Sequence, residues 1–287
     1  MAVKAKDIAN QMGISVSTVY KAFNGADDIN AETRAAVLET AAEMGYTGGA
    51  LQKISKRVCV FMGRMEAPHV TYYLYEVMLA FKQVAEGHGY EVIIRSLEDE
   101  NCTSFYHIME QERFDGAMVL GLNDSSPFFD QLDRIAYPIV LVDNYVEGKL
   151  ISCVTSDNLS GIGMAVAHLI QLGHRRIGFI NGEQQSFSSR ERFAGFLSAI
   201  TLGGLTYDPE LVYHGNFSEH SGEEGAETLL DKGVTALVCA SDLMAIGAIR
   251  WLKKQGLQVP QDMSVTGFDD IRISTYISPA LTTVRIN

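Results

Sequence analysis

The chain has 287 residues, of which 47% are hydrophobic and 20% are charged, and its formal net charge is −12. This composition is that of an ordinary globular protein and excludes an intrinsically disordered chain. The sequence has no run of about 18 apolar residues and no apolar signal core at its start, which excludes a membrane span and a secretory leader. The four cysteines show no Cys-x-x-Cys spacing, so we expect reduced thiols in the cytoplasm and no metal site.

The negative charge is unevenly distributed along the chain. Residues 1–57 carry seven basic and six acidic side chains, a net charge of +1, which leaves −13 on the remainder. The charge of the whole chain disfavours a nucleic-acid partner, but a near-neutral N-terminal part does not exclude one.

Residues 4–45 show three short helical patterns. The first runs from Lys6 to Met12 and is ended by Gly13. Ser15 can cap the second helix, and Asn30 can cap a third over residues 31–44. The sequence therefore predicts a small all-helical domain with a glycine-containing turn between its first two helices.

The second helical pattern has an unusual exposed face. Val19, Ala22 and Phe23 share the inward face at helical spacing. The opposite face carries Val16, Ser17, Tyr20 and Lys21. A methyl group, a hydroxyl, an aromatic ring and a cation on the second helix of a helix-turn-helix are suited to the DNA major groove. The alternative is an amphipathic helix pair in some other small bundle.

From Val58 onward, near-continuous apolar strands alternate with amphipathic helices. The expected strands lie at residues 58–62, 91–96, 116–121, 138–143, 175–181, 236–241 and 263–268. This alternation predicts an α/β fold with parallel sheets covered on both faces. The predicted organisation is a helical domain at residues 1–47, a linker at 48–57 and an α/β domain at 58–287, with lobes at about 58–157 and 158–283.

Several motifs resemble one family closely. "KDIANQMGISVSTVYKAFNG" and "INAETRAAVLETAAEMGY", followed by "SSRERFAGF" and "SPALTTV", resemble the lactose-repressor/purine-repressor family of bacterial transcription factors. The resemblance implies a helix-turn-helix headpiece followed by a two-lobed, periplasmic-binding-protein-like effector domain. It implies a cytoplasmic homodimeric repressor of operator DNA, with an effector between the lobes that we expect to be a carbohydrate, and no cofactor. Family members usually continue for a few tens of residues beyond "LTTVRIN", so we expect the C-terminal part to be missing.

The resemblance also assigns DNA contacts. The candidates are Ser15, Val16, Ser17, Thr18, Tyr20, Lys21, Asn24, Leu51 and Ile54. Tyr20 stands where the family usually has a small serine, which suggests an unusual operator. Gly48 and Gly49 replace the Pro-Asn of the family hinge, and Leu51 or Ile54 is the nearest apolar candidate for its minor-groove wedge. We therefore expect modest operator bending.

Effector contacts are implied in the same way. The candidates are Tyr72, Tyr73, Asp143, Asp157, Arg192, Phe217, Ser241, Asp242 and Asp269. Arg192 and Asp269 are expected on loops after strands, where opposite charges would hold ligand hydroxyls. Phe217 matches the aromatic residue that stacks on a sugar face. For Asp157 and Asp242, an N-cap is the alternative to a ligand contact.

Three other functions compete with this interpretation. A metabolic enzyme on a doubly wound fold is disfavoured because "GIGMAVAHL" lacks the third glycine of a dinucleotide fingerprint and no catalytic motif is present. A free-standing solute-binding protein is disfavoured by the helical N-terminal domain. A purine-responsive regulator of the same fold, controlled by a corepressor, remains open.

Overall fold

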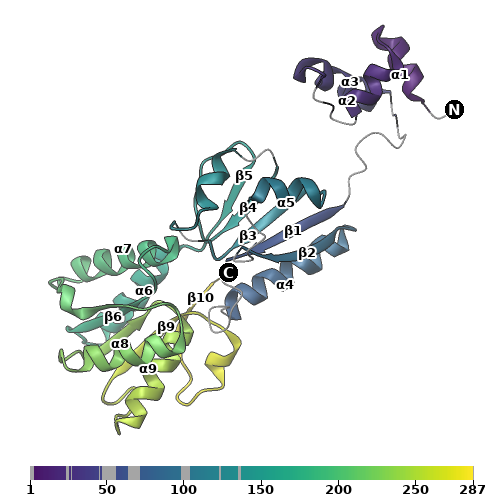
Figure 1. The fold of residues 1–287 in the computed structure, drawn as a ribbon. Coiled ribbons are helices and arrows are strands. Elements are labelled where there is room, and N and C mark those ends of the chain that lie inside the picture. Colours follow the sequence, from purple (N-terminus) through teal and green to yellow (C-terminus); the bar gives the residue numbers. More distant parts are fainter. Residues whose placement is uncertain are drawn as a thin grey trace. The chain divides into compact units, whose positions relative to one another are not determined.

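The computed structural model divides the chain into two compact units (Figure 1). The first comprises Met1–Arg57 with Arg113–Asp115, and the second Val58–Glu112 with Gly116–Asn287. The structure describes residues 3–23, 26, 28–44, 46, 56–63, 72–97, 104–122, 124–134 and 137–286. Among these residues, no helix is long and apolar enough to cross a membrane.

The described part of the first unit is helical, as predicted. It contains α1 (Ala5–Met12), α2 (Val16–Phe23) and α3 (Ala31–Glu43). α1 ends at Gly13, whose φ of 65° glycine adopts without steric cost. The Ser15 hydroxyl caps α2 by accepting from the Thr18 N–H at 3.0 Å, and Asn30 caps α3 by accepting from the Thr33 N–H at 2.6 Å.

A small core holds these helices together. Its buried residues are Ala5, Ile8, Ala9, Val19, Ala22, Phe23, Val37, Ala41 and Tyr46. The rings of Phe23 and Tyr46 stack with their centroids 5.3 Å apart. Because α2 supplies its apolar residues to this core, its opposite face remains exposed to solvent.

The first sheet of the second unit has the strand order β2-β1-β3-β4-β5. Its strands are β1 (Arg57–Met62), β2 (Glu91–Ser96), β3 (Gly116–Leu120), β4 (Ile139–Val142) and β5 (Ile151–Val154). The pairs β1–β3, β3–β4 and β4–β5 are parallel. The connecting elements include α4 (Tyr72–Gly87), α5 (Phe105–Gln111) and the 3-10 helix η1 (Phe129–Arg134).

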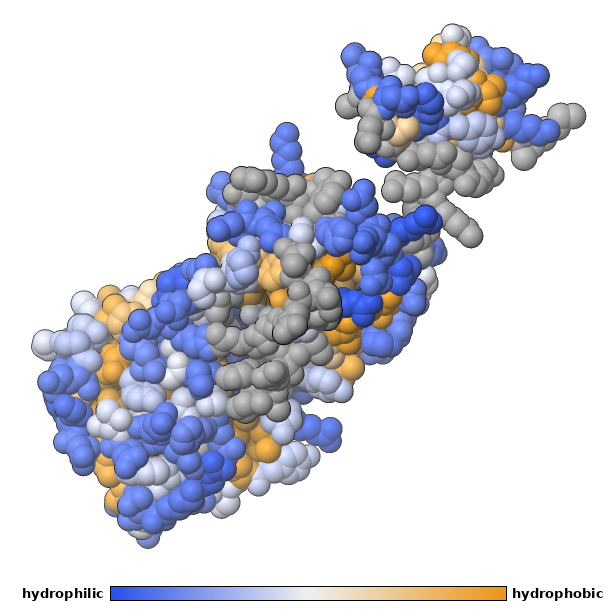
Figure 2. Space-filling model, viewed as in Figure 1, coloured by the Kyte–Doolittle hydropathy of each residue, from blue (hydrophilic) through white to orange (hydrophobic). Residues whose placement is uncertain are grey.

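The second sheet has the strand order β10-β9-β8-β6-β7, and its strands pair in parallel. Its strands are β6 (Ile177–Asn181), β7 (Val212–His214), β8 (Ala236–Cys239), β9 (Ser264–Asp269) and β10 (Thr282–Arg285). Its helices are α6 (Asn158–Gln171), α7 (Phe187–Leu202), α8 (Glu219–Leu230) and α9 (Asp242–Lys254), with 3-10 helices η2 (Pro209–Leu211) and η3 (Arg272–Thr275). Figure 2 shows a largely hydrophilic surface over α8 and α9, which fits helices that cover one face of a sheet.

Two glycines allow α8 and α9 to pack closely. A Cβ at Gly222 would lie 2.0 Å from the Met244 carbonyl oxygen, and one at Gly247 would lie 1.9 Å from the Glu219 carbonyl oxygen. Only glycine permits this backbone approach. The close contact fixes the amino end of α9, which begins at the edge of the functional site described below.

The seven predicted strands are all present, but the sequence interpretation did not identify β7 and β10, and it recognised β5 only as an apolar strand-like run around Cys153. β7 and β10 are the two edge strands of the second sheet, and β5 is an edge strand of the first. Edge strands are short and partly exposed, so they lack the continuous apolar run that identifies a central parallel strand.

Candidate functional site

The exposed face of α2 presents the side chains expected to read DNA. Val16 is 37% exposed, Tyr20 is 45% exposed, and Ser17 and Lys21 are also exposed. The opposite face of α2 is buried in the headpiece core. A valine methyl group can contact the thymine methyl group, and a lysine ammonium can donate to the guanine acceptors. The structure thus brings these four side chains together on one accessible surface.

The candidates for phosphate contacts are placed only in part. The Ser15 and Thr18 hydroxyls lie 2.8 Å apart at the amino end of α2, where helix N–H groups favour anions. Asn24, Leu51 and Ile54 lie outside the described residues, as does the glycine-containing hinge. The expectation of modest operator bending therefore stays a prediction.

Lys21 has a partner that the sequence did not reveal. Its ammonium donates to Oδ2 of Asp28, in the connection between α2 and α3. This hydrogen bond is the main cause that lowers the pKa of the Asp28 carboxyl below its ordinary value. Asp28 is therefore ionised at neutral pH, and it lies beside the DNA-reading face.

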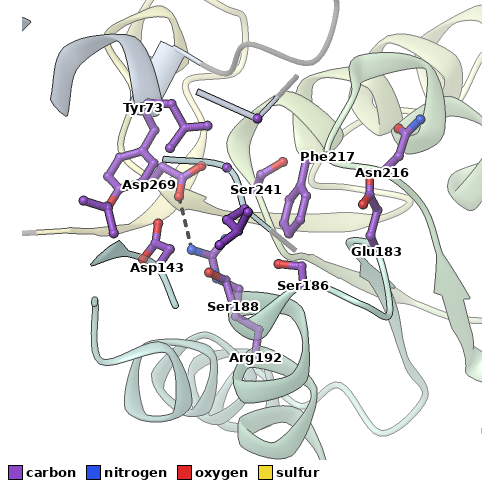
Figure 3. Close-up of a pocket in the computed structure, with 15 residues that line it drawn as sticks. Tyr73, Asp143, Glu183, Ser186, Ser188, Arg192, Asn216, Phe217, Ser241 and Asp269 are labelled. Atoms are coloured by element: carbon purple, nitrogen blue, oxygen red, sulfur yellow. Dashed lines mark ion pairs between the residues drawn. The ribbon is translucent and has the colours of Figure 1, made fainter. Parts of the chain in front are cut away.

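The second unit contains a solvent-open cleft (Figure 3). Its lining comes from the carboxyl ends of strands in both sheets and from the first turns of α4, α7 and α9. The lining residues are Gly63, Tyr73, Leu74, Gly121, Leu122, Val142, Asp143, Glu183, Ser186, Ser188, Arg192, Asn216, Phe217, Ser241 and Asp269. The position beyond the carboxyl ends of parallel strands is that of a small-molecule site.

Arg192 is the cation of this cleft, and it is already well partnered. It lies in α7, so the expectation of a loop position was wrong, and it is 3% exposed. Its Nε donates to Oδ1 of Asn158 at 2.8 Å, and one η nitrogen donates to the Ala240 carbonyl oxygen. The other η nitrogen lies 3.6 Å from Oδ1 of Asp269, and the guanidinium stacks 3.9 Å above the Phe268 ring. These contacts fix the guanidinium rigidly.

Asp269 ends β9 and faces Arg192 (Figure 3). Its side chain is only 8% exposed. Burial raises the pKa of its carboxyl to about 8, because desolvation and the nearby carboxylates of Asp242 and Asp143 outweigh the attraction of Arg192. A ligand that donates hydrogen bonds would favour the ionised form.

Asp143, which follows β4, and Tyr73, in the first turn of α4, face the same part of the cleft. Burial is the largest cause that raises the pKa of each group, and the Asp143 carboxyl raises that of Tyr73 further. Oδ1 of Asp143 and Oδ1 of Asp269 are buried without a hydrogen-bond partner among the described residues. The cleft therefore offers acceptor atoms that a ligand with donor groups would satisfy.

Backbone strain is concentrated at this cleft. Asp143, Phe217 and Asp269 have φ angles of 53°, 63° and 115°, and they are three of the six non-glycine residues with positive φ in the described chain. The Phe217 ring fits because residue 182 is glycine, where a Cβ would lie 2.1 Å from the ring. Strained residues cluster at functional sites, where the surrounding structure holds side chains in place.

Three of the predicted effector residues, Tyr72, Asp157 and Asp242, do not line the cleft. Tyr72 is 53% exposed, because consecutive helix residues point about 100° apart and Tyr73 takes the inward position. Asp157 caps α6 by accepting from the Ser160 N–H at 3.0 Å. For Asp157 the structure thus supports the N-cap alternative.

Asp242 has neither of the roles considered for it. The N-cap of α9 is Ser241, which also lines the cleft. Asp242 is fully buried behind it and accepts from the Ile271 N–H at 2.9 Å, the Ser274 hydroxyl at 2.6 Å and the Thr283 hydroxyl at 2.5 Å. It therefore ties α9 to η3 and β10, and we assign it a structural role.

Several lining residues escaped the sequence interpretation. The polar ones are Glu183, Ser186, Ser188 and Asn216. Ser186 caps α7 by accepting from the Ser189 N–H, a position that the serine-rich stretch before α7 could have indicated. At the rim, Arg190 of α7 pairs at 2.6 Å with Asp124, which follows β3, so the two sheets are linked beside the cleft.

The raised pKa of Asp269 predicts an unusual pH dependence of stability. Between the ordinary value of 3.8 and about 8, the folded protein keeps a proton that the unfolded chain releases. This group therefore makes the ligand-free protein less stable as pH rises through that window, by up to about 1.4 kcal/mol per pH unit. Thermal melts of wild type and Asp269→Asn from about pH 5 to about pH 8 measure the effect. The same change of Tm with pH in wild type and in Asp269→Asn would contradict this prediction.

Two family models match the chain. The model of bacterial regulatory proteins of the lacI family matches residues 4–48, and the model of periplasmic binding protein-like domains matches residues 166–287. The first match contains α1, α2 and α3, and the second contains most of the second sheet and its helices.

Similar proteins span almost the whole chain. It is 30% identical to the HTH-type transcriptional repressor PurR of Haemophilus influenzae, over 98% of this chain and 85% of that protein. It is also 30% identical to the repressor CytR of Escherichia coli K12, over 99% of this chain and 84% of that protein.

Solved structures are similar over the same length. The complex of the transcriptional regulator CelR with cellobiose has a TM-score of 0.74 and 28% identity, and covers 99% of this chain and 88% of that one. The lac repressor dimer bound to operator and the anti-inducer ONPF has a TM-score of 0.69 and 26% identity, with the same coverage.

Proposed function

Because the chain belongs to the lacI family of bacterial regulatory proteins, we propose that α2 reads the operator and that the cleft binds an uncharged, hydroxyl-rich effector. The protein is a DNA-binding transcriptional repressor with a small-molecule effector. The relatives named above are regulators and not enzymes. We propose that the present chain also has no enzymatic activity and binds DNA in the cytoplasm.

In the proposed complex, α2 enters the major groove. Val16, Ser17 and Lys21 contact base edges, and the hydroxyls of Ser15 and Thr18 face phosphates. A homodimer, the state in which the lac repressor was solved on its operator, presents two such helices. The operator is then pseudo-palindromic, with half-sites related by the dimer axis.

One observation supports the choice of effector: the cleft has an excess of acceptor atoms. The Asp143 and Asp269 carboxylates each carry a buried oxygen without a hydrogen-bond donor among the described residues. Arg192, the cation in the lining, already donates to Asn158 and Ala240. Hydroxyl groups could donate to these oxygens and also accept from the remaining N–H groups of Arg192, whereas a phosphate group that supplies only acceptor atoms would leave the two buried oxygens unsatisfied.

The Phe217 ring favours a flat apolar ligand face. Its centroid lies 5.9 Å from Cζ of Arg192, so a sugar ring could stack on it while its hydroxyls reach the carboxylates. The similar regulator CelR was solved with cellobiose. A purine could also stack on Phe217, but it carries fewer donors for the two carboxylates, and it remains the second candidate.

The proposed switch is a coupling between the cleft and the headpieces. A ligand that contacts both sheets favours one relative arrangement of the two lobes, and this arrangement changes the separation of the two headpieces in the dimer. The effector then shifts operator affinity by a coupling free energy, typically about 1–3 kcal/mol.

A thermal-shift screen tests the effector assignment. The ligands are neutral mono- and disaccharides, their phosphate esters, and purine bases and nucleosides. A ligand at about 100 times its Kd stabilises the fold by about 2.7 kcal/mol. We expect a neutral sugar to raise the Tm and its phosphate ester to have no effect. Stabilisation by the phosphate ester alone, or by purines alone, would overturn the assignment.

Lys21→Ala tests base recognition. We expect operator affinity to fall by about 1–3 kcal/mol and the preference at one base pair to relax, because the ammonium is the only charged group on α2. Competition binding to operators with single base-pair changes measures both effects. Equal weakening on operator and random DNA would show instead that Lys21 contacts a phosphate.

A further inference from the structure

The DNA-reading face of α2 carries a single charge, and that charge is neutralised. Lys21 is the only ionisable cation or carboxylate among the residues of α2, VSTVYKAF. Its ammonium forms an ion pair with Asp28, and the two side chains are 48% and 60% exposed. A lysine ammonium has three N–H donors, so the pair occupies one and leaves two available.

Asp28 lies in the connection between α2 and α3, where two neighbouring residues form backbone hydrogen bonds. The Ala26 N–H donates to the Lys21 carbonyl oxygen at 3.0 Å, and the Ile29 N–H donates to the Ala26 carbonyl oxygen at 3.3 Å. Ile29 packs against the headpiece core, and Asn30 begins the cap of α3. The ion pair with Lys21 places the Asp28 carboxylate beside the exposed end of that side chain.

We propose that Asp28 is a specificity-determining residue of the DNA-reading surface, which orients the Lys21 ammonium toward base acceptors and repels phosphates. This inference rests on the proposed function of α2. On an operator, Lys21 keeps its pair with Asp28 and donates a remaining N–H to a base. On other DNA, a phosphate that accepts from the ammonium would lie beside the Asp28 carboxylate, which repels it.

Because the headpiece has a small net charge, a single carboxylate should have a measurable influence on its affinity for random DNA. Residues 1–57 have a net charge of only +1. Binding to random DNA depends almost entirely on phosphate neutralisation. Removing one carboxylate beside the DNA-reading face should therefore increase the affinity for random DNA. A contact between Lys21 and a base, in contrast, adds affinity only on the operator.

The test compares Asp28→Asn with a matched control, Glu39→Gln. Glu39 is an exposed carboxylate on α3, and both changes remove one charge with little change of shape. The probes are a random-sequence duplex and the duplex that wild type enriches from a random pool. Asp28→Glu, which keeps the charge, serves as the rescue variant.

We expect Asp28→Asn to bind the random duplex about three- to fivefold more tightly, the size of one exposed ion pair. The plot of log affinity against log salt for random DNA should steepen by about 0.9, which corresponds to one further phosphate contact. The ratio of operator to random affinity should fall by the same factor. Glu39→Gln and Asp28→Glu should leave that ratio within about twofold of wild type.

Three outcomes would overturn the inference. An unchanged affinity ratio in Asp28→Asn would show that Asp28 does not govern discrimination. Equal weakening on both duplexes, with a lower Tm, would show that Asp28 only supports the turn. If wild type enriches no sequence from the pool, the proposed function of α2 fails as well, and this result is distinct from the other two.

Discussion

At the effector concentration that half-saturates wild type, Asp269→Ala should remove most of the effect of the effector on operator binding, while leaving operator affinity without effector within about twofold of wild type. The carboxylate lies in the cleft, 3.6 Å from an η nitrogen of Arg192, and its Oδ1 has no hydrogen-bond donor among the described residues. Loss of a charged acceptor for ligand hydroxyls should weaken effector binding by about 1.5–3 kcal/mol, or roughly 10- to 150-fold. The headpiece belongs to the other compact unit, so its contacts with DNA remain.

This substitution should cost little stability. The pKa of the Asp269 carboxyl is raised to about 8 by burial, which shows that its ionised form is poorly stabilised in the ligand-free protein. Arg192 keeps its hydrogen bonds to Asn158 and Ala240. The matched control is Asp270→Ala, which removes the next carboxylate, paired with Arg285 and absent from the cleft lining.

Operator titrations with and without effector, for wild type and both variants, measure the outcome. Asp270→Ala should respond as wild type does. A normal response of Asp269→Ala at the same effector concentration would show that the cleft assignment is wrong. Loss of the fold together with DNA binding would make Asp269 a structural residue.

Asp242→Ala should have the largest effect on stability. Its carboxylate is fully buried and accepts from the Ile271 N–H and from the hydroxyls of Ser274 and Thr283. The alanine side chain leaves these three donors without their acceptor and removes the connection between α9, η3 and β10. We expect a loss of about 3–5 kcal/mol in the free energy of unfolding.

Urea unfolding of wild type, Asp242→Ala and Asp242→Asn measures this loss. The asparagine variant retains an acceptor oxygen and should lie between the other two. If Asp242→Ala instead unfolds as wild type does but fails to bind effector, Asp242 is a ligand contact. Substitutions of the two buried carboxylates should thus have different effects. Asp242→Ala should lower stability, whereas Asp269→Ala should lower effector affinity.

The fold was predictable wherever residues are buried on both faces. β3 and β8 are buried along their full length and form continuous apolar runs, which sequence periodicity detects directly. β7 has only three residues, and β10 has exposed ends and two half-buried central residues. These edge strands are specified by pairing with a neighbour distant in sequence, which no local pattern contains.

The sequence could predict which strand ends form the site but not which side chains contact one another there. Parallel strands converge at one edge, so Asp143, Ser241 and Asp269 could be grouped before their contacts were known, whereas Phe217 was assigned only by the family resemblance. The hydrogen-bond partners of Arg192 could not be predicted from the sequence, because Asn158 and Ala240 belong to separate segments of the chain. The same limit applies to Asp242, whose acceptor role depends on residues 29 to 41 positions away.

The measurement that tests the central claim most directly is the affinity of the full chain for its selected operator, without effector and at a saturating concentration of the sugar that raises the Tm most. Fluorescence anisotropy at one fixed salt concentration is sufficient. We predict that the sugar changes operator affinity at least about fivefold, and that operator changes sugar affinity by the same factor, because the coupling is reciprocal. Equal operator affinities with the cleft empty and with the cleft saturated would contradict a ligand-controlled repressor.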